Sequence, residues 1–295
     1  MALERRSYGQ AGDEVTVIGL GGTSLFKHSF NDGVATVHRA LELGVTYFDT
    51  SPAYGRGMTQ AILGYALEGR KDEVMLATKL AMRTPARFRT YDGLRAQLEE
   101  SLTLLRRDSV DTLQIHESDH QVWWTDTPPD ERYVRADTGY DYAGAPVARV
   151  LRDAKAERLC RYTGVTGNTV DGVRIAFSNL DVDACLTAFN YDILRRRSRR
   201  ELIPLVKARN AVVLLGAVIR LPERMPEAVE RLRGVSREVG ISVLELTLRY
   251  LINDSDVTCV LVGASTPTEI EESVGAAEKG PLPAGLHQRL EEMGD

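Results

Sequence analysis

The sequence predicts an α/β protein that folds as a closed (β/α)8 TIM barrel. Short runs rich in β-branched and aromatic residues alternate eight times with longer segments of helical periodicity. The length of 295 residues is usual for this architecture, and no linker-like stretch divides the chain. We therefore expect residues 1–295 to form a single barrel domain.

The expected elements follow in order along the chain. Residues 5–17 alternate around a Gly-Gln-Ala-Gly turn and predict a short β-hairpin before the barrel. The buried, strand-like runs lie at 15–22, 45–49, 74–79, 110–116, 160–165, 184–189, 211–216 and 258–263. The helical segments that follow them lie at 32–43, 57–68, 90–106, 144–157, 168–178, 197–208, 242–253 and 267–277. Asn31 and Asp32 are the expected caps of the first helix, and residues 166–168 those of the fifth.

Three segments add to this repeating pattern. The long loop 117–143 after the fourth strand contains both tryptophans of the chain. Long ordered loops are usually functional, so we expect Trp123 and Trp124 to form a wall or lid of a substrate pocket. A surface loop anchored by its aromatic residues is the alternative. Residues 225–238 predict an additional helix, and the tail from Leu282 predicts one more helix outside the barrel.

The composition excludes several classes of protein. The formal net charge is −5, and no aromatic residues are interleaved with the basic cluster from Arg195 to Arg200, so we expect no nucleic-acid partner. These arginines suit a surface at a helix start or an anion-facing loop. Cys160, Cys185 and Cys259 are widely spaced in apolar runs, which predicts buried thiols in a reducing compartment. Neither a signal peptide nor a membrane span is visible, so we expect a cytoplasmic protein without a membrane partner.

Four polar residues at strand ends form a coherent acid/base set. Asp49 closes the second strand, and Tyr54 follows it after a Ser-Pro turn. Lys79 closes the third strand and His116 the fourth. We expect the charge of Lys79 to lower the pKa of Tyr54, while Asp49 keeps Lys79 protonated. His116 would donate to, or orient, a carbonyl oxygen beside the same phenol, and such a set suits proton transfer at a carbonyl or alcohol.

These residues resemble the catalytic tetrad motifs of the aldo-keto reductases. The order, the spacing and the strand-end positions agree for the stretches 48–55, 77–79 and 113–116, and the likeness extends over about residues 19–273. The run from Tyr54 to Gly64, together with Gly167 and Asn190, is similar to the bacterial aldose 1-dehydrogenase branch of that family. The resemblance implies a hydride-transferring oxidoreductase in which Tyr54 is the general acid or base and the cofactor is NAD or NADP.

The resemblance also implies positions that would contact the nicotinamide half of the cofactor. Gly22 and Thr23 correspond to backbone contacts near the ring, and Thr166 stands where the family usually has a serine that holds the carboxamide. Asn190 stands at the position of a common glutamine. Many members stack an aromatic residue on the ring after the seventh strand, whereas Leu215 and Gly216 offer none here. The expected contacts are therefore Gly22, Thr23, Asp49, Thr166, Asn190, Leu215 and Gly216.

By the same resemblance, residues 262–273 correspond to the adenosine end. NADP-preferring members often carry a lysine at the position of Gly263 and an arginine at that of Glu269, and neither cation is present. A carboxylate repels a 2′-phosphate and accepts a hydrogen bond from a 2′-hydroxyl, which favours NAD. Ser265 and the start of the following helix are a possible phosphate site, which weighs toward NADP. The expected contacts at this end are Gly263, Ser265, Glu269, Glu272 and Ser273.

Three functions are compatible with the sequence. The first is an oxidoreductase that interconverts a carbonyl compound (aldehyde, ketone or aldose) and its alcohol or lactone, as a monomer or small homo-oligomer. The second is a nucleotide-binding sensor or partner subunit with little turnover, a role that the β-subunits of potassium channels show within this family. The third is a hydrolase or lyase on the same barrel. The tetrad favours the first, and it leaves the natural substrate and the direction of the reaction open.

Overall fold

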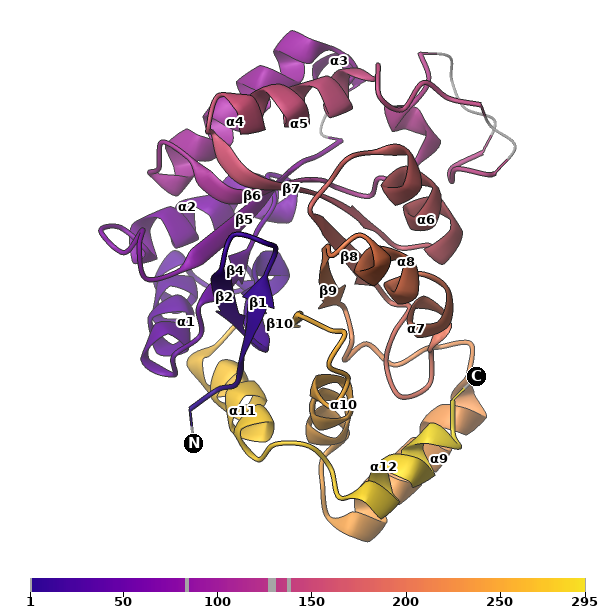
Figure 1. Ribbon diagram of the computed structural model, residues 1–295. Coiled ribbons are helices and arrows are strands. Elements are labelled where there is room, and N and C mark those ends of the chain that lie inside the picture. The colour runs from indigo at the N-terminus through magenta and orange to yellow at the C-terminus, as the bar shows by residue number, and fades with distance from the viewer. Residues whose placement is uncertain (1, 83–84, 127–130, 137–138, 295) are drawn as a thin grey trace.

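The computed structural model describes residues 2–82, 85–126, 131–136 and 139–294. Eight parallel strands close into a barrel in the order β10-β3-β4-β5-β6-β7-β8-β9, and helices surround them (Figure 1). Each strand pairs with the next one along the chain, and the last closes against the first, as successive right-handed β-α units require. The predicted (β/α)8 barrel is confirmed.

The barrel strands are short and buried. They are β3 (Ile18–Gly21), β4 (Tyr47–Asp49), β5 (Met75–Leu80), β6 (Val110–Ile115), β7 (Cys160–Gly167), β8 (Ala184–Ala188), β9 (Val212–Gly216) and β10 (Cys259–Gly263). The helices that connect them are η1 (Gly22–Ser24), α1 (Phe30–Glu42), η2 (Tyr54–Gly57), α2 (Met58–Ala66), α3 (Pro85–Phe88), α4 (Tyr91–Leu105), η3 (Gln121–Trp123), α5 (Pro146–Ala156), α6 (Val170–Asn179), α7 (Arg197–Glu201), α8 (Ile203–Ala208), α9 (Pro226–Val239), α10 (Val243–Ile252), α11 (Pro267–Glu278) and α12 (Ala284–Glu291).

Successive residues of each strand face the barrel interior and the helices in turn. In β9, Leu214 belongs to the cluster inside the barrel, and Leu215 belongs to the larger core between strands and helices. In β4, Tyr47 faces inward and Phe48 outward. The inward positions at the carboxyl ends of the strands therefore meet at one mouth of the barrel, where active sites of this architecture lie.

The N-terminal hairpin closes the opposite end of the barrel. Its strands, β1 (Arg5–Tyr8) and β2 (Asp13–Thr16), pair in antiparallel fashion. Tyr8 is fully buried, and its hydroxyl lies 2.8 Å from Oγ1 of Thr112 and 3.2 Å from the hydroxyl of Tyr47. The floor of the barrel is thus filled by an aromatic side chain that is hydrogen-bonded to two strands.

Several boundaries differ from the prediction. The first barrel strand begins at Ile18 instead of residue 15, because residues 13–16 pair with the hairpin partner. The predicted helix 197–208 is two helices, since Pro204 in the first turn of α8 has no N–H with which to continue the bonding of α7. The remaining elements, including the helix at 226–239 and the C-terminal helix, lie where the sequence predicts them, within a few residues.

The predicted helix caps are confirmed for Asp32 and wrong for Asn31 and residues 166–168. Ser29, and not Asn31, caps α1: its hydroxyl accepts from the backbone N–H of Asp32, and the Asp32 carboxylate accepts from that of Ser29. At α6, the carboxylate of Asp119 accepts from the backbone N–H groups of Asn168 and Thr169, at 3.0 and 2.9 Å. A cap supplied by a neighbouring loop has no local sequence signal.

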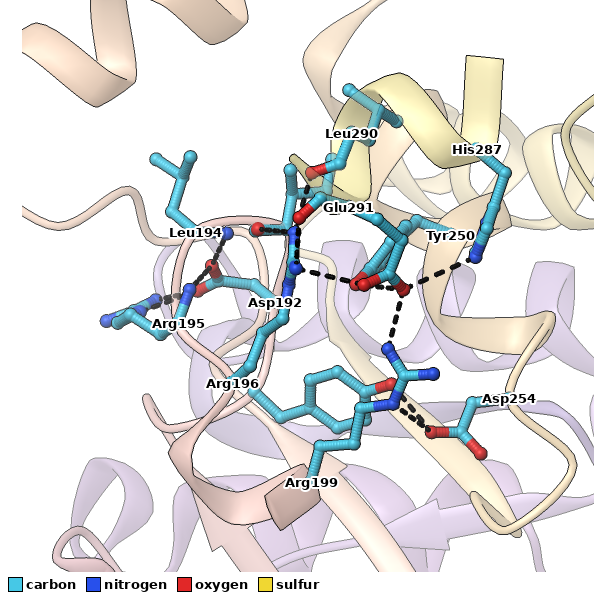
Figure 2. Close-up of polar contacts among 12 residues, drawn as sticks. Asp192, Leu194, Arg195, Arg196, Arg199, Tyr250, Asp254, His287, Leu290 and Glu291 are labelled. Atoms are coloured by element: carbon cyan, nitrogen blue, oxygen red, sulfur yellow. Dashed lines mark hydrogen bonds and ion pairs between the residues drawn. The ribbon is translucent and has the colours of Figure 1, made fainter. Parts of the chain in front are cut away.

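The basic cluster after β8 anchors the C-terminal helix. Glu291 of α12 accepts hydrogen bonds from Arg199 and Tyr250 and pairs with Arg196 (Figure 2). Arg196 also donates to the backbone carbonyls of Ile193 and Leu290, and Arg195 forms an ion pair with Asp192. The expectation of an anion-facing loop is therefore wrong for Arg195, Arg196 and Arg199, because acidic groups of the same chain bind their guanidinium groups.

The three cysteines are free and buried, as predicted. Burial raises the pKa of the Cys160 thiol to about 12 and raises those of Cys185 and Cys259 further, so the thiols are inert at neutral pH. None of the helices in the described ranges has both the length and the apolar character that crossing a bilayer requires.

Candidate active site

A cavity of about 680 Å³ opens at the carboxyl ends of the strands. All eight barrel strands contribute to it, either directly or through the residue that follows the strand. Its volume lies within the range of about 300–1,000 Å³ that is typical of small-molecule sites. Asp49, Tyr54, Lys79 and His116 all line this cavity. The four side chains thus come together from the carboxyl ends of β4, β5 and β6 and from η2, which follows β4.

The carboxylate and the ammonium of this set form a buried ion pair. Lys79 and Asp49 are each 2 % exposed, and Nζ of Lys79 donates to Oδ1 of Asp49 and to the backbone carbonyl of Thr50. Burial alone would lower the pKa of Lys79, but the charges of Asp49 and Tyr54 outweigh burial and raise it. The second carboxylate oxygen of Asp49 accepts from Nε2 of Gln114, at 3.0 Å. Lys79 is therefore held as an ammonium.

The phenol of Tyr54 lies between the other two groups. Nζ of Lys79 is 5.1 Å from the centroid of its ring, and Nε2 of His116 is 3.5 Å from its hydroxyl. Burial raises the pKa of Tyr54, and the charge of Lys79 lowers it by less, so the net pKa lies above 10. The prediction that Lys79 acts to lower this pKa has the right sign, but the predicted net direction is wrong, because desolvation of the phenolate is the larger effect.

His116 is oriented by a hydroxyl that the sequence did not reveal. Oγ of Ser51 lies 3.0 Å from Nδ1 of His116 and accepts a hydrogen bond from the backbone N–H of Ala53. We infer that the Ser51 hydroxyl donates to Nδ1, because its proton has no other acceptor within hydrogen-bond distance in the described part of the chain. This direction leaves the imidazole proton on Nε2, the nitrogen that faces Tyr54. Burial, with the charges of Lys79 and His120, lowers the pKa of His116 to about 3, so the ring is neutral at physiological pH.

Glu117, directly after His116, also lines the cavity and was not predicted. Its backbone φ of 52° lies in the left-handed region, and its N–H donates to Oγ1 of Thr166, at 3.0 Å. The amide of Asn168 donates to Oε1 of Glu117, at 2.9 Å. The only sign in the sequence of a site residue at position 117 is its place directly after His116 at the end of a strand.

The structure places the two tryptophans, which were expected to form a wall or lid of a substrate pocket, outside this cavity. Trp123 and Trp124 are 4 % and 6 % exposed, and neither lines the cavity. Their indole N–H groups donate to the backbone carbonyls of His116 and Ser118, at 3.0 and 2.9 Å. They anchor the loop to the end of β6, which is the alternative considered above. Residues 127–130 and 137–138 of this loop lie outside the described residues.

The predicted contacts with the nicotinamide half divide into two groups. Thr23, Asp49, Thr166 and Gly216 line the cavity. Leu215 does not, because it points outward into the core. Gly22 does not line the cavity either, and its carbonyl accepts a hydrogen bond from the Thr59 hydroxyl.

Asn190 does not reach the cavity either. Its amide donates to the backbone carbonyls of Ala188 and Asn168, at 2.6 and 2.9 Å. The cause is Phe189, whose φ of 65° turns the chain before Asn190. Phe189 itself lines the cavity, as does Gly216, and supplies an aromatic side chain that the sequence did not predict there.

At the predicted adenosine end, only Gly263 lines the cavity. The Glu269 carboxylate accepts from the backbone N–H and the hydroxyl of Ser265, at 2.6 and 2.9 Å. These are the groups that were expected to bind phosphate. Ser273 is buried and donates to the carbonyl of Glu269 within the helix, and Glu272 is exposed. The carboxylate of Glu269 therefore occupies the two donors of Ser265, just before α11.

Comparison with known proteins identifies the family. The sequence profile of the aldo/keto reductase family matches residues 17–295. This chain belongs to the aldo/keto reductase family. Among its relatives are L-galactose dehydrogenase of Arabidopsis thaliana, 25 % identical over 93 % of this chain and 88 % of the relative, and D-threo-aldose 1-dehydrogenase of a Pseudomonas species, 23 % identical over 96 % and 95 %.

The solved structures agree with this assignment at the level of the fold. An aldo-keto reductase from Bacillus halodurans in its holo form superposes with a TM-score of 0.80, at 23 % identity, over 99 % of this chain and 97 % of that chain. The chain is thus an oxidoreductase of the aldo/keto reductase family with the barrel of that family.

Proposed function

We propose that this aldo/keto reductase interconverts a carbonyl compound and its alcohol, or an aldose and its lactone, with Tyr54 as the general acid or base. The observation that carries the proposal is the convergence at one mouth of the barrel. The hydroxyl of Tyr54 lies 3.5 Å from Nε2 of a neutral His116, and Nζ of Lys79 lies 5.1 Å from the ring of Tyr54. A proton donor, a hydrogen-bond donor and a fixed positive charge thus share one oxygen-binding position.

The residues around the cavity fit a nicotinamide dinucleotide. Gly216 and Gly263 line it without side chains, and Phe189 and Leu186 add flat or apolar surface beside Gly216. A methyl group added to Gly216 would come within 3.3 Å of Leu186, so the glycine keeps this wall open. When bound there, the dinucleotide supplies the hydride donor or acceptor that the side chains lack.

Each member of the tetrad then has a distinct role. Tyr54 gives its proton to the carbonyl oxygen during reduction, or takes it from the hydroxyl during oxidation. Lys79 stabilises the phenolate by its charge, and Asp49 keeps Lys79 protonated and in place. The Nε2–H of His116 donates to the substrate oxygen and so orients it beside the phenol.

We favour NAD over NADP as the cofactor. The carboxylate of Glu269 is bound to Ser265, and its pKa is lowered by these hydrogen bonds, so it is ionised. A fixed negative charge at the start of α11 opposes a 2′-phosphate there. The relatives named L-galactose dehydrogenase and D-threo-aldose 1-dehydrogenase support an aldose as the substrate and oxidation as the direction.

A turnover screen tests the proposal. Aldoses, aliphatic aldehydes and aromatic aldehydes are offered in both directions with NAD(H) and NADP(H), and the absorbance of the reduced nicotinamide is followed. We expect turnover that depends on added cofactor. The opposite outcome is that fluorescence shows binding of the nucleotide while no carbonyl compound is turned over. That result would refute the enzyme proposal and favour a nucleotide-binding sensor.

A further inference from the structure

Glu117 is held in an unfavourable backbone conformation at the cavity wall. Residues with a side chain seldom adopt its φ of 52°. Two hydrogen bonds hold the turn to the end of β7: the N–H of Glu117 donates to the hydroxyl of Thr166, and that of Ser118 donates to the Thr166 carbonyl, at 2.6 Å. Strain of this kind persists where the surrounding structure enforces it and is frequent at functional sites. The turn fixes the Glu117 side chain beside His116.

The carboxylate of Glu117 has one occupied and one unoccupied oxygen. Oε1 accepts from the amide of Asn168. The nearest basic atom to Oε2 is Nε2 of His120, at 3.9 Å, but that nitrogen accepts a hydrogen bond from Arg132 and so carries no proton. Within the described ranges, no protein donor reaches Oε2. The Glu117 side chain as a whole is 30 % exposed.

The position of Glu117 relates it to the reacting groups. It follows His116 in sequence, and it lines the same cavity as Tyr54. Burial is the main cause of the raised pKa of Tyr54, and the negative charge of Glu117 adds to it, so the two groups are within electrostatic reach. The other carboxylate of the cavity wall, Asp49, is fully engaged with Lys79 and Gln114. Glu117 is therefore the carboxylate that remains available to a substrate.

We propose that Glu117 determines substrate specificity by accepting hydrogen bonds from hydroxyl groups next to the reacting carbon, and that it selects polyhydroxylated aldehydes over hydroxyl-free ones. The inference rests on the proposed carbonyl chemistry at Tyr54. A hydroxyl-bearing chain whose carbonyl oxygen lies at Tyr54 and His116 brings its next hydroxyls toward the residue that follows His116. The same charge rejects substrates with a carboxylate or phosphate in that place.

The test compares two substrates that differ only in hydroxyl groups, racemic glyceraldehyde and propanal. The variants are Glu117→Gln, which keeps the shape, and Glu117→Gly, which suits the left-handed backbone and so favours folding. Glu227→Gln, an exposed position on α9, is the matched control. We expect the preference for glyceraldehyde, as a ratio of kcat/KM values, to fall about 10- to 100-fold in both Glu117 variants, mainly through KM. The control should keep the wild-type ratio.

Binding is measured separately by ligand-observed NMR with a mixture of pentitols. We expect saturation transfer to the pentitols with the wild-type protein and its loss in Glu117→Gly. Equal effects on both aldehydes, or unchanged pentitol binding, would overturn the assignment of Glu117. Pentitol binding that depends on Glu117, without turnover of any carbonyl compound, would instead refute the proposed function and keep the binding role. A preference for a cationic aldehyde that Glu117→Gln abolishes would overturn the selection of hydroxyl groups.

Discussion

The hydroxyl of Ser51 lies 3.0 Å from Nδ1 of His116, on the side of the imidazole that faces away from Tyr54. The backbone N–H of Ala53 fills one acceptor site of the hydroxyl. Among the described residues Nδ1 is the acceptor within reach of the hydroxyl proton, so we infer that Ser51 donates toward the ring. With that direction the hydrogen bond selects the Nε2–H tautomer of His116, whose proton faces Tyr54 and, by our proposal, the substrate oxygen. It makes the serine in the turn after β4 a positioning residue.

We expect Ser51→Ala to lower kcat by about 3- to 10-fold, because the loss of one hydrogen bond releases the tautomer and the ring orientation of His116. Binding of the cofactor should remain at the wild-type level. Single-turnover kinetics measure the first effect, and nucleotide fluorescence titration measures the second. Ser51→Thr, which keeps the hydroxyl, should restore most of the rate. If Ser51→Ala were as fast as the wild type, the tautomer argument would fail.

Tyr54→Phe removes the proton donor and leaves the ring in place. We expect turnover to fall by about 10²- to 10⁴-fold, the usual contribution of general acid–base catalysis. The dissociation constant of the cofactor should change little, since the lost hydroxyl serves the substrate oxygen. Parallel rate and binding measurements decide between catalysis and binding, and a variant with wild-type turnover would refute the role of Tyr54.

The neutral state of His116 predicts a specific pH dependence of stability. Its pKa is about 3 in the folded protein and about 6.5 when unfolded, so the unfolded chain binds the extra proton between these values. The free energy of unfolding should therefore decrease as the pH falls below about 6.5, by up to about 2 kcal/mol at pH 5 from this group alone. Urea unfolding of wild type and His116→Gln at pH 7 and pH 5 measures the difference. The variant should lose less stability than the wild type over this interval.

Because Asp49 and Lys79 form a buried ion pair, we expect the effects of mutating them on the free energy of unfolding to be non-additive. Lys79→Met leaves a buried carboxylate without its counter-charge, and we expect a loss of about 3–5 kcal/mol in the free energy of unfolding. Adding Asp49→Leu removes the unpaired charge as well and should recover part of that loss. Denaturant titration of both single variants and the double variant completes the cycle. Additive losses would show that the two groups do not interact in the folded protein.

We expect the contact between Glu269 and Ser265 to determine the preference for NAD over NADP. Glu269→Arg frees the donors of Ser265 and places a cation at the start of α11, so the ratio of kcat/KM with NADPH to that with NADH should rise by about 10-fold or more. Glu269→Gln is the control for the removal of charge alone and should give a smaller rise. An unchanged ratio in Glu269→Arg would show that the adenosine end of the cofactor lies elsewhere.

The sequence by itself determined the barrel and the approach of the strand-end residues Asp49, Lys79 and His116. Strand residues alternate between two faces, so polar residues that close successive parallel strands must meet at one mouth, whatever the loops do. Lys79 closes such an alternation, and it reaches Asp49 as that pattern requires. Gln114 could have been predicted in the same way, since it lies two residues before His116 and so shares its face.

Only the tertiary structure decided what happens after the strands end. Left-handed turns at Glu117 and Phe189 break the alternation. The side chains of both residues line the cavity, which the sequence did not predict, while Asn190 is turned away from it. The indoles of Trp123 and Trp124 bond to backbone carbonyls that sequence spacing does not locate. The direction in which the pKa of Tyr54 shifts likewise depends on burial. Desolvation grows with the protein packed around a group, and no local pattern of residues records how much protein that will be.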